Sequence, residues 1–154
     1  MKKTLKQKEI DSLDHKILTE LQKNARIANA EIGRRVGLSA PAVGDRISKL
    51  EQHGYIEGYR TVLNMEKVGL TIQALISFKS ENMKHKEMLK MVEAIPEVAE
   101  WYAVTGSYCM MVKVIVATSR QLESVIAKLG QHGDTSTSLI LSGSSSSKMV
   151  AISR

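Results

Sequence analysis

The sequence has few of the residues that build disulfide-linked, membrane or secreted proteins. Cys109 is the single cysteine among 154 residues, so no internal disulfide can form and a reducing, cytoplasmic setting is expected. No apolar run reaches the roughly 18 residues that a membrane-spanning helix needs. The basic start, MKKTLKQKEI, leads into no apolar stretch, so we expect neither a signal peptide nor a membrane partner.

The sequence also lacks the spacings that mark enzymes and metal proteins. Its four histidines are scattered, and no H-E-x-x-H, C-x-x-C or glycine-rich phosphate-binding motif is present. Cys109 stands beside two methionines, which is typical of a small apolar side chain and not of an activated thiolate. We therefore predict no catalytic residue, no metal site and no cofactor.

What the sequence does have is a basic excess toward its start. The formal net charge is +6, and residues 1–60 hold 12 Lys and Arg against 8 Asp and Glu. Such a balance suits a polyanion such as double-stranded DNA, although ordinary surface charge explains it equally well. The lysine-rich first residues are interpreted either as an arm that touches DNA or as a flexible, solvated start.

Residues 29–54, NAEIGRRVGLSAPAVGDRISKLEQHG, predict two short amphipathic helices joined by a tight turn. Ile32 and Val36 share one helix face, and Gly33 is expected where the second helix presses close. Gly37 is suited to end the first helix, and Ser39 to cap the second. This is the pattern of a helix-turn-helix that places its second helix in a DNA groove, and a purely structural helical hairpin is the alternative.

A further helix is predicted before this pair, and one seam joins all three. Asp11 and Asp14 have the spacing of a capping box, and Asn24 is a plausible stop. Leu13, Ile17 and Leu21 follow at four-residue spacing. Three helices around one apolar seam form a minimal DNA-binding domain.

The second helix of the pair supplies most of the candidate DNA contacts. Ser39 and Ala40 stand at its N-terminus, where backbone N–H groups attract phosphate. The predicted DNA-binding residues are Asn29, Arg34, Arg35, Ser39, Ala40, Pro41, Gly44, Asp45, Arg46, Ser48 and Lys49. Arg34, Arg35 and Lys49 are the predicted phosphate contacts.

Three of these positions keep more than one interpretation. Gly44 either lets the backbone come close to DNA or is a substitution that the helix tolerates without a functional role. Asp45 accepts from a cytosine amino group, repels phosphate, or pairs with Lys49. Arg46 clamps a phosphate or forms an internal ion pair with a carboxylate of the first helix, and the internal pair is favoured.

After residue 70 the pattern alternates between strands and helices. Strands are predicted over 71–79, 98–105, 110–117 and 135–141, with helices over 83–95 and 119–130 and a hairpin turn at Gly106-Ser107. The order β-α-β-β-α-β is the ferredoxin-like arrangement, a four-stranded antiparallel sheet with two helices on one face. The other face is left uncovered, which favours a homodimer.

The predicted fold is therefore α+β, a helix-turn-helix domain followed by a ferredoxin-like sandwich. The expected divisions are 1–58 for DNA binding, 59–70 for a linker strand and 71–154 for effector binding and oligomerisation. The serine-rich stretch after Leu141 is low in complexity, and the closing KMVAIS is interpreted as an extra edge strand or a disordered end.

From about Ile10 to about Leu141 the chain resembles the Lrp/AsnC family of bacterial and archaeal transcription regulators. The carrying segments are IDSLDHKILTELQKNAR, EIGRRVGLS, RISKLEQHGYIEGY and VAEWYAVTGSY. The resemblance implies a winged helix-turn-helix, dimers built through the sheets and the linker strand, and often rings of four dimers. It also implies a small effector, commonly an amino acid, bound between dimers near the turn after the second sheet strand.

One departure from the family concerns that turn. The family's usual G-D-Y-D is replaced by Gly106-Ser107-Tyr108-Cys109, so both carboxylates that suit an effector's ammonium group are missing. Backbone groups and hydroxyls remain, and the candidate effector residues are Thr105, Gly106, Ser107, Tyr108, Cys109, Ser136 and Ser138. Alternatively, Gly106 simply makes the turn and the serines face water.

The sequence thus predicts a homo-oligomeric, sequence-specific DNA-binding transcription regulator modulated by a small effector. An architectural DNA-binding protein without an effector is one alternative, favoured by the missing carboxylates. A subunit of an amino-acid-metabolism enzyme is a second, disfavoured by the helix-turn-helix.

Overall fold

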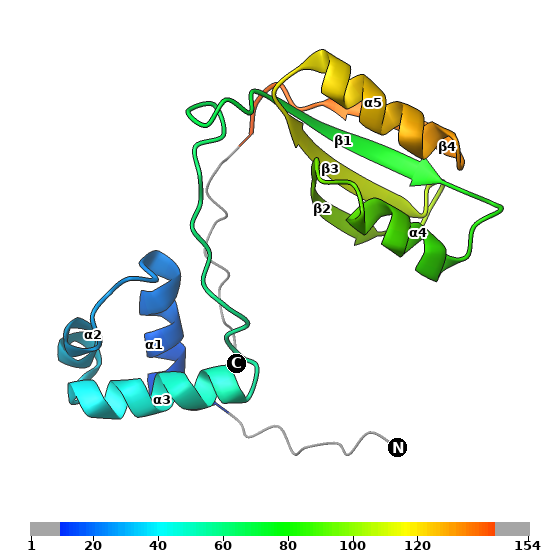
Figure 1. Cartoon of the computed structure of the whole chain (residues 1–154). Helices are drawn as coiled ribbons and strands as arrows, with labels where there is room; N and C mark the ends of the chain where they lie inside the picture. The colour runs from blue at the N-terminus through cyan, green and yellow to red at the C-terminus, as the bar shows by residue number, and fades with distance from the viewer. Residues whose placement is uncertain (1–9, 144–154) are drawn as a thin grey trace, which may run out of the picture. The chain divides into compact units, whose positions relative to one another are not determined.

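The computed structural model describes residues 10–143, which divide into two compact units. The break falls between Thr61 and Val62, inside the stretch for which the sequence predicts a linker. Unit 1 is residues 10–61 and unit 2 is residues 62–143, and each is considered by itself (Figure 1). The expected N-terminal arm and C-terminal edge strand lie outside the described residues.

Unit 1 consists of α1 (Ser12–Lys23), α2 (Asn29–Val36) and α3 (Ala40–Gln52). The Asp11 side chain accepts from the backbone N–H groups of Leu13 and Asp14, and the Asp14 carboxylate accepts from the backbone N–H of Asp11. The predicted capping box is therefore confirmed. Gly37 ends α2 in the left-handed conformation at φ 77°, and the Ser39 hydroxyl caps α3. The three helices enclose a core of Ile17, Ile32, Val43 and Leu50.

The turn between α2 and α3 is held by a close backbone contact. A Cβ on Gly33 would stand 2.3 Å from the carbonyl oxygen of Leu38, so no other residue fits without a shift of the turn. The sequence assigned this close approach to the second helix, whereas the structure places it on the turn that leads there. The contact fixes the angle at which α3 leaves α2.

Two expected features are absent from the described part of the chain. Unit 1 has three helices and no strand between residues 10 and 61, so the wing implied by the family resemblance is not formed there. Residues 59–70, expected as a linker strand, form no strand in the single chain. A lone segment has no neighbour with which to share strand hydrogen bonds, so pairing there requires a partner segment.

Unit 2 has the predicted β-α-β-β-α-β order. Its elements are β1 (Ile72–Lys79), α4 (His85–Glu93), β2 (Val98–Ala103), β3 (Met110–Val116), α5 (Ser119–Gly130) and β4 (Asp134–Leu139). The strands form one antiparallel sheet in the order β2-β3-β1-β4, which confirms the ferredoxin-like topology. Each strand and α4 differ from their predicted bounds by one to two residues at one or both ends, because helix and strand ends fray.

The two faces of the sheet differ in what covers them. Ala74, Ile76 and Phe78 of β1 are fully buried against α4 and α5, as the alternation predicts (Figure 1). The opposite face, which we call the bare face, carries Gln73, Leu75 and Ser77 of β1 with Met111, Lys113 and Ile115 of β3 opposite them. No helix in the described chain is long and apolar enough to cross a membrane.

Candidate nucleic-acid interface

The outer side of α3 is open to solvent. Val43 and Leu50 are buried in the core, while Pro41, Asp45, Ser48, Lys49 and Gln52 are exposed on the other side of the same helix. The Ser39 hydroxyl, 3.3 Å from the Ala42 nitrogen, satisfies one of the free N–H groups of the first turn. The helix therefore presents a polar face and a capped N-terminus, as entry into a major groove requires.

Gly44 lies partly buried on α3 and faces the start of α2. A Cβ at this position would stand 3.2 Å from the side-chain nitrogen of Asn29. The two predicted DNA-binding residues are thus neighbours in space, although 15 positions separate them in the sequence. Gly44 leaves room for the Asn29 amide at this edge of the helix-turn-helix.

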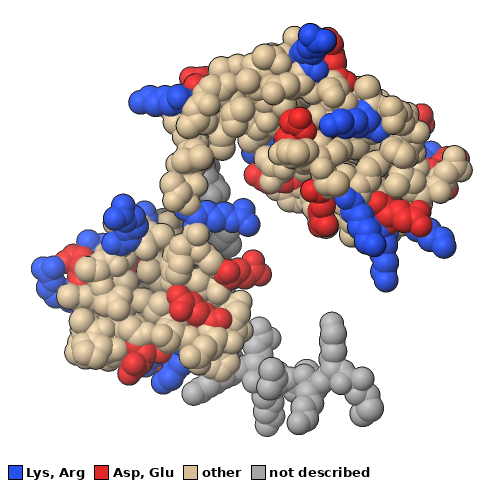
Figure 2. All heavy atoms as spheres, in the orientation of Figure 1, with Lys and Arg blue, Asp and Glu red and all other residues tan. Residues whose placement is uncertain are grey.

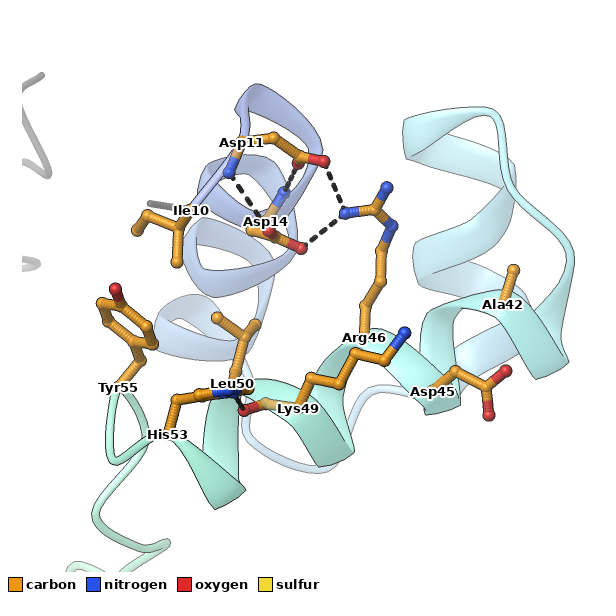
Figure 3. Close-up of a pocket in the computed structure, with 10 residues that line it drawn as sticks. All are labelled: Ile10, Asp11, Asp14, Ala42, Asp45, Arg46, Lys49, Leu50, His53 and Tyr55. Atoms are coloured by element: carbon orange, nitrogen blue, oxygen red, sulfur yellow. Dashed lines mark hydrogen bonds and ion pairs between the residues drawn. The ribbon is translucent and has the colours of Figure 1, made fainter. Parts of the chain in front are cut away.

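Arg46 makes the internal ion pair that the sequence analysis favours. Its Nη1 lies 2.7 Å from a carboxylate oxygen of Asp11 and 2.7 Å from one of Asp14 (Figure 3). Hydrogen bonding from the Asp14 backbone, and then from Arg46, lowers the pKa of Asp11 below its ordinary value. The Asp14 and Asp11 carboxylates raise the pKa of Arg46 in turn. The pair ties the first turn of α1 to the middle of α3.

A hollow of about 380 Å³ lies beside this ion pair, between α1 and the flank of α3 (Figure 3). Ile10, Leu50 and Tyr55 line one part of it, and charged side chains of Asp45, Arg46 and Lys49 line another. Ala42 and His53 also line it and are absent from the predicted site. Positions 42, 46, 49 and 53 recur at three- to four-residue intervals and so lie on one face of the helix. The helical period could therefore have identified Ala42 and His53 from the sequence.

Arg34 and Arg35, at the end of α2, are engaged with carboxylates. Arg35 pairs with Glu20 of α1 and, at 3.0 Å, with Glu31 one turn earlier, and Arg34 pairs with Glu31 as well. Glu20 is only 9% exposed, and Lys23, then Arg35, lower its pKa. Sequence reasoning missed Glu20, because its partner lies on another helix.

Lys49 differs from these arginines in being exposed and making no ion pair with any described residue. On the face shown in Figure 2, cationic and anionic side chains are interspersed over each unit, with no broad patch of one sign. Of the predicted phosphate contacts, Lys49 is the one whose charge is not paired with a described carboxylate and is therefore available to a phosphate.

The candidate effector residues lie on two segments of unit 2. Residues 104–109 form a six-residue connection between β2 and β3, longer than the four residues, 106–109, that lie between the predicted strands. It is closed by a 3.1 Å bond from the Val104 nitrogen to the Cys109 oxygen. Ser136 and Ser138 lie on β4 opposite Ser77 and Leu75 of β1, so both point to the bare face. The two aromatic residues of β2 differ in exposure: Trp101 packs against the core, and Tyr102 is 53% exposed.

Comparison with known proteins agrees with both units. Residues 10–51 match the AsnC-type helix-turn-helix domain, and residues 73–150 match the Lrp/AsnC ligand binding domain. The chain belongs to the Lrp/AsnC family. It is 35% identical to the HTH-type transcriptional regulator YezC of Bacillus subtilis over 88% of this chain and 96% of that one.

Solved structures of Lrp/AsnC proteins share the fold. The transcriptional regulator NMB0573 of Neisseria meningitidis, in complex with L-Met, superposes with a TM-score of 0.81 at 29% identity, covering 87% of this chain and 91% of that one. AsnC of E. coli superposes with a TM-score of 0.80 at 30% identity, and the match covers 94% of this chain and 98% of that one. The chain is thus a DNA-binding transcriptional regulator with a ligand-binding domain, and not an enzyme.

Proposed function

We propose that this Lrp/AsnC protein is a homo-oligomeric regulator that recognises a specific DNA sequence and changes its DNA affinity when a small effector binds. The observation that carries the DNA part is the outer side of α3, which is exposed and polar from Pro41 to Gln52. Side chains on that side specify the sequence through base edges, and Ser39, Arg34, Arg35 and Lys49 position the protein on phosphate.

We infer self-association from the bare face of the sheet. Leu75, Met111 and Ile115 lie there, and Tyr102 is exposed at its edge. Tyr59, Val62 and Leu63 of the linker are also exposed and apolar or aromatic. Apolar surface of this kind is normally covered in an assembly, and a two-fold dimer would present two copies of α3 to DNA.

The proposed effector is a small molecule such as an amino acid, bound between dimers at Thr105 to Cys109 with Ser136 and Ser138. The ligand-binding domain of the family and the L-Met complex of the Neisseria meningitidis relative support this class of ligand. Binding would act by linkage, because a ligand that prefers one assembly also shifts the affinity of that assembly for DNA.

The test combines three measurements on the full chain. Selection of bound fragments from a genomic library, followed by anisotropy titration, is expected to yield an operator bound at least about 10³-fold more tightly than random duplex. Light scattering is expected to report a dimer or a larger even assembly. Equal affinity for all duplexes would contradict sequence-specific regulation.

An architectural DNA-binding protein without an effector is the second candidate. The 104–109 connection favours it, because Ser107 and Cys109 replace the carboxylates of the family's usual turn. Thermal-shift scans against the standard amino acids separate the two, since a ligand that binds the native state raises the melting temperature. No shift by any amino acid, with tight and unspecific DNA binding, would favour the architectural role.

A further inference from the structure

His53 closes the C-terminal end of α3 with two bonds to one carbonyl group. Its backbone nitrogen donates to the Lys49 carbonyl oxygen at 3.0 Å, and its ring atom Nδ1 lies 2.6 Å from the same oxygen (Figure 3). A carbonyl oxygen only accepts hydrogen bonds, so Nδ1 carries a hydrogen and donates it. The other ring nitrogen, Nε2, therefore has no hydrogen when the ring is neutral.

This bond makes the second donor of His53 depend on proton uptake. The neutral ring can only accept at Nε2, whereas the imidazolium also donates there. Imidazole is the side chain that ordinarily changes its charge between pH 5 and 8. The end of a helix suits the charged form, because its last carbonyl groups carry a partial negative charge. An anion can therefore accept a hydrogen bond from Nε2 only after the ring has taken up a proton.

His53 shares one side of α3 with two predicted DNA contacts. Asp45, Lys49 and His53 are all exposed and recur at four-residue intervals along the helix (Figure 3). Lys49 lies one turn before His53, about 6 Å along the axis, and Asp45 lies two turns before it, at about 12 Å. Neither Lys49 nor His53 makes an ion pair with a described residue. Both are thus available to an anion at this end of the helix.

Most carboxylates near this end of α3 are bound to other groups. Asp11 and Asp14 of α1 each lie 2.7 Å from Arg46. Glu51 accepts from the Tyr59 hydroxyl at 2.9 Å. The ionisable side chains that line the hollow together with His53 are Asp11, Asp14, Asp45, Arg46, Lys49 and Tyr55. Of these carboxylates, Asp45 is the one with no ion pair to a described residue, and Lys49 stands between it and His53 along α3.

The neighbouring ammonium group links the charge of His53 to the presence of an anion. Two cations one helical turn apart repel each other, so Lys49 disfavours the His53 imidazolium in the free protein. A phosphate that contacts both side chains removes this repulsion, because it attracts each of them. Proton uptake at Nε2 and phosphate binding therefore favour each other.

We propose that His53 is a phosphate contact of α3 that binds only in its protonated form, so that DNA binding takes up protons and strengthens as the pH falls. The proton comes from solvent and is held at Nε2, between the ring and a phosphate oxygen. Lys49 contributes the permanent charge beside it. The contact positions the protein on the DNA backbone and reads no base. The inference rests on the proposed placement of α3 against DNA.

The first experiment measures DNA affinity against pH for the full chain, His53→Gln and His53→Lys. A random-sequence duplex is suitable, because phosphate contacts do not depend on sequence. Anisotropy titrations run from about pH 5.5 to 8.5 at one salt concentration. Toward the acid end, wild-type affinity is expected to gain about tenfold over that of His53→Gln, the effect of one charged hydrogen bond.

His53→Lys distinguishes a charge from a structural role. Its ammonium group keeps its charge over the whole range, so this variant should bind at about pH 8 as tightly as the wild type binds at about pH 6. It should also lose the additional pH dependence of the wild type. His85→Gln, at an exposed histidine of α4 in unit 2, is the matched control and should keep the wild-type profile. Circular dichroism at each pH verifies that all variants are folded.

The second experiment observes the ring itself. Nitrogen NMR spectra of the full chain, free and bound to the duplex, report the protonation of His53 at each pH. The complex is expected to show the imidazolium at a pH at which the free chain shows the neutral ring, because an adjacent phosphate favours the charged form. Identical ring signals in the free and bound chain would contradict a phosphate contact at Nε2.

The outcomes separate this inference from the function beneath it. If DNA binds and His53→Gln keeps the wild-type pH profile, DNA binding stands and the His53 assignment is wrong. A wild-type affinity that does not change with pH overturns the assignment as well. If no duplex binds at any pH in the range, the placement of α3 against DNA and this assignment are both wrong.

Discussion

Arg46 of α3 and Asp14 in the first turn of α1 are joined by a 2.7 Å ion pair. Asp14 is also the residue that completes the capping box with Asp11. Arg46 therefore pairs with the capping box of α1, and Arg46 itself lies on α3, the helix that is proposed to enter DNA. The orientation of α3 and the integrity of the first turn of α1 depend on the same contact.

The pH dependence of unit 1 should report this contact. Because the native-state pKa of Asp11 lies below its ordinary 3.8, its charge stabilises the fold above that pH. This stabilisation is lost as the pH falls through the native pKa. Arg46→Gln should move the Asp11 pKa upward and lower the unfolding free energy near neutral pH by about 0.2–1 kcal/mol, as for exposed pairs. Carboxyl NMR titration measures the pKa, with Arg120→Gln in α5 as a control that leaves it unchanged.

Salt titrations of DNA binding should identify the phosphate contacts. Arg35→Ala and Lys49→Gln are each expected to reduce the slope of log affinity against log salt by about 0.9. Arg35→Ala should also lower the melting temperature, because it removes a partner of the buried Glu20 carboxylate, whereas Lys49→Gln should not.

Lys86→Gln, an exposed lysine of α4 in unit 2, serves as the control and should leave the slope unchanged. An unaltered slope in Arg35→Ala with a lower melting temperature would make Arg35 a structural residue only. The same slope result in Lys49→Gln would remove Lys49 from the phosphate contacts.

Gly33→Ala should disturb the turn between α2 and α3. The added methyl would lie 2.3 Å from a backbone oxygen that cannot rotate away, so the turn must shift. We expect a loss of about 1–3 kcal/mol in unfolding free energy, as in overpacked sites, together with weaker DNA binding. Gly130→Ala in α5 is the control, since nothing lies within 4 Å of its added carbon. Equal stability of wild type and Gly33→Ala in urea would contradict the close contact.

Substitutions at Gly44 should separate helix stability from DNA contact. Gly44→Ala is expected to stabilise α3 by about 0.5–1 kcal/mol, because only the mobile end of Asn29 must move. Bulky residues at Gly44 or Ala40, such as leucine, are expected to abolish operator binding while circular dichroism shows an intact fold. Native operator affinity in Gly44→Leu would place this edge of α3 outside the interface.

A charge on the bare face should prevent assembly. Ile115→Lys replaces an apolar side chain of the bare face with an ammonium group, whose burial without a partner is costly. Light scattering is expected to give the monomer mass, with circular dichroism unchanged. Glu123→Lys, on the helix-covered side of unit 2, should keep the wild-type mass. A dimer of Ile115→Lys would show that the chains associate through another surface.

Local patterns predicted the elements because local chemistry decides them. The capping box at Asp11, the left-handed Gly37 and the N-cap Ser39 each depend on residues within a few positions. The alternation from Ile72 to Phe78 likewise states which side chains are buried. The linker strand expected at 59–70 is not formed in the single chain, because a strand requires a partner segment with which to share its hydrogen bonds.

The sequence by itself determined the order of the elements, the faces they bury and the family, because periodicity and helix capping depend on residues that are close together in the sequence. Only the tertiary structure decided which charges meet. Glu20 and Arg35, and Arg46 and Asp11, are 15 and 35 positions apart, and only folding brings them together. The angle between helices and the register between strands set such distances, and neither follows from the spacing of residues along one element.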